Sequence, residues 1–197
     1  MKADFPSESA LQSAASLLQC EVAAIKAVAR VEAGSEGAFL ENGEPVILYE
    51  AHVFDRLTGG KFRGVRAMHI SGEPGILSRE HWTLGTYGSY SIQHARLNAA
   101  AELDRTAALK SCSWGLFQIL GENYKRAGFK ELQAFINAMY RDVNAHLTAL
   151  CCFILTDERL LAAIRARDWV TFARIYNGPG YRRNRYDEKL AAEFGRF

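Results

Sequence analysis

The spacing of apolar residues predicts helices along most of the chain. Val22, Ile25 and Ala29 recur at intervals of three and four residues, so they share one face of a helix over residues 21–32. Glu32 falls on the same face and places a carboxylate among apolar side chains. Similar patterns predict a helix capped by Ser7 and ending at Leu18, and helices over residues 51–57, 92–103, 104–110, 114–119, 130–138, 141–155, 157–166, 169–176 and 185–194, with Ser113, Asp157 and Asp168 as N-caps.

One β-hairpin is expected between the second and third helices. Residues 38–41 and 44–50 flank Asn42-Gly43, a dipeptide that strongly favours a tight hairpin turn. Glycines recur through residues 61–90, which predicts an irregular segment of the kind that tends to be functional in compact domains. No repeat and no composition shift divides the chain. The expected fold is therefore α+β, predominantly α-helical, as a single domain over residues 1–197.

Composition narrows the class of protein and its compartment. Of the 197 residues, 49% are hydrophobic and 23% are charged, and the net charge of +2 is too small to indicate nucleic acid binding by charge alone. Residues 1–10 lack the apolar segment of a secretion signal. The longest apolar run, residues 149–155, is far shorter than the roughly 20 residues that span a bilayer. The sequence predicts a soluble protein made in the cytoplasm, without membrane insertion.

The cysteines and histidines do not suggest a metal or redox site. The cysteines show no Cys-x-x-Cys spacing, and the five histidines form no pair with the spacing of a zinc-binding helix. We interpret the four thiols as reduced core residues, namely Cys20, Cys112, Cys151 and Cys152. No metal and no cofactor are therefore expected.

Glu32 is the first candidate catalytic residue. It ends an apolar helix face, and Gly34 and Gly37 follow it and let the backbone turn sharply. Because an apolar pocket disfavours the ionised carboxylate, the pKa of Glu32 is expected to rise toward ~6. Such a group keeps a proton near neutral pH and can act as the general acid in glycosidic bond cleavage. The alternative is that Glu32 only caps the helix or forms an ion pair.

Two further segments place polar side chains in apolar surroundings. Gln118 is the polar residue of a tightly packed turn, where it either ties loops together or presents its amide to a ligand. Tyr176, Asn177 and Tyr181 lie at a helix end and in the turn that follows it. Phenol rings and amides of this kind suit sugars that carry N-acetyl groups. The alternative for this second segment is that Asn177-Gly178 only forms a helix C-cap.

Four motifs occur in the order found in a known family. They are Val31-Glu32-x-Gly34, Gly43-x-Pro45-Val46-Ile47-Leu48-x-Glu50-x-His52-x-Phe54, Ser113-Trp114-Gly115-Leu116-Phe117-Gln118-Ile119 and Tyr176-Asn177-Gly178-Pro179-Gly180-Tyr181. Through them, residues from about 23 to about 194 resemble the N-acetylmuramidase domain of phage endolysins from Gram-negative hosts, distant relatives of goose-type lysozymes and lytic transglycosylases. The resemblance implies a lysozyme-like fold and cleavage of the β-1,4 bond after N-acetylmuramic acid in peptidoglycan.

The resemblance also implies individual roles. Glu32 matches the glutamate that ends the catalytic helix and would be the general acid, and Gln118 matches the glutamine that lines the sugar groove. Tyr176 and Asn177 match the Tyr-Asn pair that borders the catalytic glutamate. Further candidates for substrate contact are Trp114, Tyr124 and Tyr181. We expect a monomer without a separate wall-binding module, which stays in the host cytoplasm until a holin-like pore releases it to the wall in the periplasm.

The second carboxylate is expected to be Glu50. It ends the longer hairpin strand on the side of Leu48, whereas Glu41 adjoins the turn. A separation of about 6.5–9.5 Å from Glu32 would predict inversion and one of about 5–5.5 Å retention, a relation for which lysozyme is the type case. A transglycosylase that closes a 1,6-anhydro ring needs no second carboxylate.

Two other functions are compatible with parts of the sequence. Cys112 at a predicted helix start, with His146 downstream, suggests an amidase or peptidase that cuts wall peptides. A basic C-terminal segment suggests a non-catalytic surface for the cell wall or a nucleic acid, or one that assists approach to an anionic envelope; it contains Arg174, Arg182, Arg183, Arg185, Lys189 and Arg196.

Overall fold

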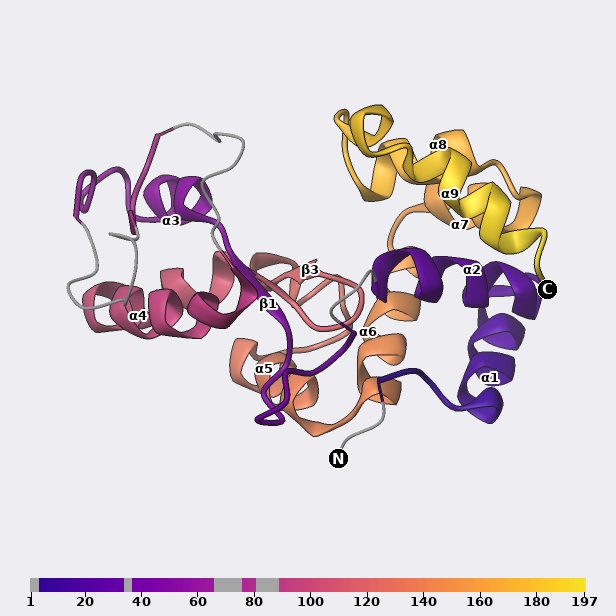
Figure 1. The fold of residues 1–197 in the computed structure, drawn as a ribbon, viewed down its shortest axis with the longest axis horizontal. Coiled ribbons are helices and arrows are strands. Elements are labelled where there is room, and N and C mark those ends of the chain that lie inside the picture. Colours follow the sequence, from indigo (N-terminus) through magenta and orange to yellow (C-terminus); the bar gives the residue numbers. More distant parts are fainter. Residues whose placement is uncertain (1–3, 34–36, 66–75, 81–88) are drawn as a thin grey trace.

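The computed structural model describes residues 4–33, 37–65, 76–80 and 89–197, which form helices around a small sheet (Figure 1). The elements are α1 (Glu8–Leu18), α2 (Val22–Ala33), β1 (Ile47–Tyr49), α3 (Ala51–Leu57), η1 (Tyr90–Ile92), α4 (Gln93–Lys110), β2 (Cys112–Trp114), β3 (Ile119–Leu120), η2 (Gly121–Asn123), α5 (Leu132–Arg141), α6 (Val143–Leu155), α7 (Glu158–Ala166), α8 (Trp169–Tyr176), η3 (Tyr181–Asn184) and α9 (Tyr186–Phe194). Helices α3 and α4 lie at one end, α1, α2, α7, α8 and α9 at the other, and the sheet lies between them.

Most of the predicted helices are confirmed, because their signals are local. Ser7 caps α1 by accepting a hydrogen bond from the Ala10 amide, and Asp157 and Asp168 cap α7 and α8 in the same way. The predicted break at Asp104 appears as a kink inside α4, with φ −156° and ψ 99°. The single-domain organisation stays a prediction. Gly34 and much of the segment predicted to be irregular, residues 61–90, lie outside the described residues.

The sheet differs from the predicted hairpin. Its order is β1-β2-β3, antiparallel throughout, with Leu48 opposite Ser113 and Ser113 opposite Leu120. The predicted turn at Asn42-Gly43 is present, but residues 38–41 contribute a single bridge, from Phe39 to Pro45, rather than a strand. The strand that pairs with β1 comes from more than 60 residues further along the chain, where no short-range signal could indicate it.

The helix predicted over residues 114–119 and the N-cap at Ser113 are wrong. Ser113 is the middle residue of β2, and the chain then turns back into β3. Gly115 has φ +67° and Gln118 has φ +48°, and this left-handed backbone cannot continue an α-helix. A Cβ on Gly115 would lie 2.7 Å from the His146 ring, so only glycine fits this turn.

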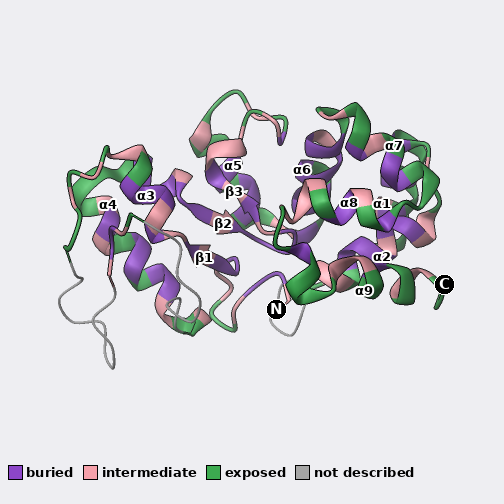
Figure 2. Ribbon diagram, turned by 90° about the horizontal axis from the view of Figure 1, so that it is seen from above, coloured by how far each residue is buried: buried purple, intermediate pink, exposed green. Residues whose placement is uncertain are grey.

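The two faces of the sheet have different surroundings. Ile47, Trp114 and Ile119 lie in the core, with 1%, 1% and 4% of their surfaces exposed. The opposite row, Leu48, Ser113 and Leu120, is only partly buried. Figure 2 shows buried residues concentrated on the inner sides of the helices and along the strands. Among the described residues, no helix combines the length and apolar character needed to cross a membrane.

Candidate active site

Glu32 lies at the C-terminal end of α2 and is held from the far end of the chain. Asn177, the residue that ends α8, donates a hydrogen bond from Nδ2 to Glu32 Oε1 at 3.0 Å. Gly178 follows with φ +80°, a conformation that favours glycine and turns the chain away from the helix. The C-cap predicted at Asn177-Gly178 is therefore present, and the same residue also reaches Glu32.

The surroundings of Glu32 favour its protonated form. Burial raises the pKa of Glu32 from 4.5 to about 7, against smaller opposing effects of the Asn177 hydrogen bond and the Lys189 ammonium. The direction of this shift confirms the prediction from the sequence. The carboxyl group is thus about half protonated near neutral pH, which is the condition under which a general acid both keeps and releases its proton.

Tyr176 links α8 to the turn between β2 and β3. Its hydroxyl donates to the Phe117 carbonyl oxygen at 2.7 Å, and its ring packs against Phe153 and Phe172. Burial, with the nearby Glu32 charge, raises the pKa of Tyr176 well above its ordinary value, so the phenol remains a donor. Tyr176 thereby fixes the turn relative to the helix end that carries the partner of Glu32.

Gln118 closes the turn on itself. Its Nε2 donates to the Gly115 carbonyl oxygen at 2.9 Å, while the residue remains partly exposed. None of the described residues donates a hydrogen bond to its Oε1. The first alternative drawn from the sequence, that Gln118 ties the loop together, is therefore present, and contact between its amide and a ligand stays a prediction.

The three remaining predicted substrate contacts differ in how far they are buried, and the role of Tyr124 stays a prediction. Trp114 is only 1% exposed and its indole N–H donates to the Leu109 carbonyl oxygen, so this ring is part of the core. Tyr181 is 5% exposed and its hydroxyl accepts a hydrogen bond from Arg182 Nε. Tyr124 is partly buried and packs against the core. A sugar cannot reach the buried rings of Trp114 and Tyr181, and their predicted contact roles are corrected accordingly.

Glu50 stands at the other end of the sheet from Gln118. It directly precedes α3, its backbone N–H donates to the Ser111 carbonyl oxygen, and its Oε2 lies 3.5 Å from His52 Nδ1. The register places Glu50 beyond the Tyr49–Cys112 pair, whereas the turn at residues 115–118 follows the Ile47–Trp114 pair. Burial and the nearby Arg56 lower the pKa of His52, so the contact joins a carboxylate to a largely neutral imidazole near pH 7.

Arg56 and Arg30 make contacts with other side chains. Arg56 donates from Nη2 to both carboxylate oxygens of Glu122, at 2.8 and 2.9 Å. Arg30 packs with its guanidinium 4.4 Å from the centre of the Phe5 ring. Glu41 is exposed beside the Asn42-Gly43 turn, as predicted.

The arrangement of Cys112 and His146 contradicts a thiol mechanism. Burial raises the pKa of the Cys112 thiol well above its ordinary value, with the Glu50 charge adding to the effect. His146 uses Nδ1 to accept from the Leu116 amide and Nε2 to donate to the Met139 carbonyl oxygen. A protonated buried thiol and a histidine whose ring nitrogens bond the backbone cannot act as a nucleophile and base pair.

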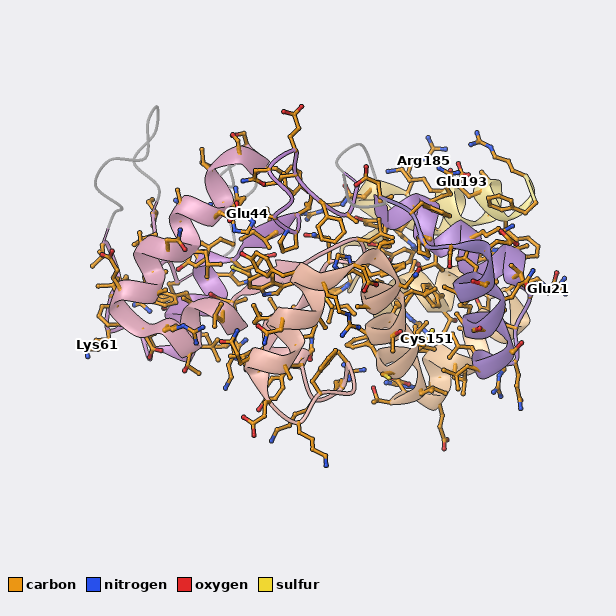
Figure 3. All side chains as sticks on the ribbon, turned by 90° about the horizontal axis from the view of Figure 1, so that it is seen from below. Glu21, Glu44, Lys61, Cys151, Arg185 and Glu193 are labelled. Atoms are coloured by element: carbon orange, nitrogen blue, oxygen red, sulfur yellow. The ribbon has the colours of Figure 1, made fainter. Side chains whose placement is uncertain are left out.

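Part of the basic C-terminal charge is paired with nearby carboxylates. Arg185 forms an ion pair with Glu188, Arg196 forms one with Glu193, and Figure 3 shows Arg185 and Glu193 at the outer edge of the molecule. Arg182 donates to the Tyr181 hydroxyl. The two ion pairs reduce the positive field of the segment and weaken the interpretation as a nucleic acid surface.

Two neighbours of Glu32 were not identified from the sequence. Tyr186 and Lys189 lie on α9, which packs along α2, and both interact electrostatically with Glu32. The Lys189 ammonium lies 5.6 Å from the centre of the Tyr186 ring. The only local signal was their spacing of three residues, which puts them on one helix face but does not indicate which helix they meet.

Comparison with known proteins identifies the family. A sequence model of the N-acetylmuramidase family matches residues 21–197. The crystal structure of the Burkholderia AP3 phage endolysin is similar, with a TM-score of 0.81 and 37% identity over 98% of this chain and 70% of that one. No curated protein matches the chain. The family match covers most of the chain, including every residue around Glu32, and the chain therefore belongs to the N-acetylmuramidase family.

Proposed function

We propose that the protein is an endolysin that cleaves the β-1,4 bond between N-acetylmuramic acid and N-acetylglucosamine, with Glu32 as the general acid. The observation that carries this proposal is the hydrogen bond from Asn177 Nδ2 to the Glu32 carboxyl group, at a site where burial raises the pKa of Glu32 to about 7. Membership of the N-acetylmuramidase family and the likeness to a phage endolysin support the choice of peptidoglycan as substrate.

In the proposed reaction, Glu32 transfers its proton to the glycosidic oxygen while the bond between that oxygen and the anomeric carbon breaks. The electron pair of the bond goes to the departing sugar, and a water molecule adds to the anomeric carbon. Gln118 Oε1 is proposed to accept a hydrogen bond from the N-acetyl group of a bound sugar, and Asn177 to border the same sugar. Tyr176 is proposed to act indirectly, since its hydroxyl is already bonded to Phe117.

Glu50 is proposed as the base that activates the water. Glu50 directly precedes α3 and lies beyond the Tyr49–Cys112 pair, at the end of the sheet away from the turn at residues 115–118. Inversion requires a water between the two carboxyl groups, whereas retention requires direct attack by the second carboxylate. The anomeric form of the first product released from peptidoglycan distinguishes the two.

A lytic transglycosylase is the second candidate. It is favoured by the observation that the side chain bonded to Glu32 is the amide of Asn177 rather than a second carboxylate. In that reaction Glu32 would serve first as acid and then as base, and the sugar's own hydroxyl would close a 1,6-anhydro ring in place of water.

The cellular setting is also part of the proposal. We infer that the protein acts as a monomer, remains in the host cytoplasm until a separate pore-forming protein permeabilises the membrane, and then meets the wall in the periplasm. The support is the match to the N-acetylmuramidase family, whose substrate is the cell wall.

The test is digestion of bare peptidoglycan by the purified protein, followed by mass analysis of the fragments. New reducing ends support the hydrolase, 1,6-anhydro ends support the transglycosylase, and new peptide amino groups without either would contradict both. Glu32→Gln is expected to lower turnover by about 10²-fold or more, the usual contribution of a positioned acid. Glu41→Gln, which changes an exposed carboxylate, is the matched control.

A further inference from the structure

The side-chain amide of Asn177 has one oxygen without a hydrogen-bond donor among the described residues. Its Nδ2 donates to Glu32 Oε1, but its Oδ1 is fully buried and has no hydrogen-bond partner among the described residues. Buried polar atoms are nearly always paired, and leaving one unpaired destabilises the folded state. An unpaired acceptor beside the candidate general acid therefore calls for an explanation.

Asn42 shows the ordinary arrangement for comparison. Its Nδ2 donates to Glu44 Oε2 at 2.8 Å, and its Oδ1 accepts from the Glu44 backbone N–H at 3.0 Å. Turning this amide by half a rotation would break both bonds. Among the described residues, the side-chain amide of Asn177 is bonded only through its nitrogen, to Glu32. Turning this amide over would bury the unpaired nitrogen in place of the unpaired oxygen. The protonation state of the Glu32 carboxyl group can therefore determine which orientation is favoured.

The side chain of Glu32 changes its hydrogen-bonding character during its proposed role. The ionised carboxylate only accepts, whereas the protonated carboxyl also donates. The other groups that face it are Tyr176 from α8, whose hydroxyl is committed to Phe117, and Tyr186 and the exposed Lys189 from α9. Among the described residues, the amide of Asn177 is the group that hydrogen-bonds to Glu32.

We propose that Asn177 is a two-state positioning residue for Glu32: Nδ2 donates to the ionised carboxylate, and the amide, turned over, accepts through Oδ1 from the protonated carboxyl. The same side chain thus holds Glu32 before and after it gives up its proton. The inference rests on the proposed function of Glu32 as an acid that gains and loses a proton in each cycle. It assigns to Asn177 a role toward the acid in addition to any contact with substrate.

The direct test is NMR of the free protein labelled with nitrogen-15, at pH 5 and pH 9. We expect cross-relaxation between the Asn177 Nδ2 protons and the Glu32 side-chain protons to be strong at pH 9 and lost at pH 5. The Asn42 amide is the internal control, and its contacts with Glu44 should persist at both pH values. Persistence of the Asn177 contacts at both pH values would overturn the proposal.

Two variants test the consequence for the reaction. Asn177→Asp offers acceptors only and adds a negative charge, so we expect it to shift the alkaline limb of the rate profile upward by about one pH unit or more and to lower kcat. Asn177→Ala is compatible with the backbone, at φ −91° and ψ −4°, and is expected to lower kcat by a larger factor than it changes KM, with little change in melting temperature. An unchanged kcat and pH profile in both variants would refute the role.

The two proposals fail separately. The NMR experiment uses no substrate. The conclusion that the Asn177 amide turns with pH therefore holds even if the Glu32→Gln variant remains active. Conversely, loss of activity in Glu32→Gln with an amide that never turns would support the proposed function and reject the two-state role of Asn177.

Discussion

Replacing Glu32 by glutamine is expected to stabilise the protein at alkaline pH. The folded state holds the proton of Glu32 more tightly than the unfolded state does, because burial raises its pKa from 4.5 to about 7. Below pH ~4.5 both states are protonated and the shift has no effect on stability. As the pH rises toward 7 the unfolded chain ionises first, so the free energy of unfolding falls, and the full penalty is present above pH 7.

The magnitude follows from the two pKa values. Their difference is about 2.5 pH units, and at about 1.4 kcal/mol per unit it amounts to ~3 kcal/mol. Glutamine cannot ionise and is free of this penalty. For a protein of this size, ~3 kcal/mol corresponds to a difference in melting temperature of about 6–12 °C.

The assay is thermal or urea unfolding of the wild type and Glu32→Gln between pH 4 and pH 9. We expect the stability of the variant relative to the wild type to increase by ~3 kcal/mol between pH 4 and pH 8. Glu41→Gln, at an exposed position, should show a difference that does not change with pH. A constant difference for Glu32→Gln as well would refute the argument that burial raises this pKa.

Further predictions concern activity. The rate of the wild type on peptidoglycan should fall as the pH rises through about 7, because the proton of Glu32 is lost there, and a flat profile from acid to strongly alkaline pH would remove Glu32 from the mechanism. Glu50→Gln should reduce turnover by about 10²-fold or more at an unchanged melting temperature, whereas a lower melting temperature at an unchanged rate would show that Glu50 only supports the structure. Cys112→Ser should leave the rate nearly unchanged, because burial keeps the Cys112 thiol protonated. Loss of activity in a folded Cys112→Ser variant would support the thiol mechanism.

The helices could be predicted because their determinants lie within a few residues of one another. Ser7, Asp157 and Asp168 cap helices with their own side chains, and the buried stripes repeat every three or four residues. The sheet could not be predicted in the same way. Strand β1 pairs with a segment about 65 residues away, and the backbone at Gln118 takes up a left-handed conformation that its residue type does not suggest.

The candidate site shows the same division. Glu32 could be selected because a carboxylate that ends an apolar helix face is visible in the sequence. Its bond with Asn177 joins residues 145 positions apart, and Lys189 and Tyr186 approach it only because α9 packs along α2. The prediction that Trp114 contacts substrate was wrong for a related reason. The local sequence does not show whether an aromatic side chain lines a groove or packs beneath a sheet, and Trp114 is buried in the core.

The burial that suits Glu32 to acid catalysis is also what destabilises the folded protein above neutral pH. Other contacts near the site offset this loss of stability. They are the hydrogen bond from the Tyr176 hydroxyl to Phe117, the hydrogen bond from the Leu116 amide to the His146 ring, and the packing of the core face of the sheet. They join α8, α6 and the turn at residues 115–118, and Tyr176 directly precedes Asn177, which bonds to Glu32. Any substitution that loosens these contacts should therefore lower the pKa of Glu32 toward 4.5, stabilise its ionised form and remove the acid at neutral pH, even where Glu32 itself is intact.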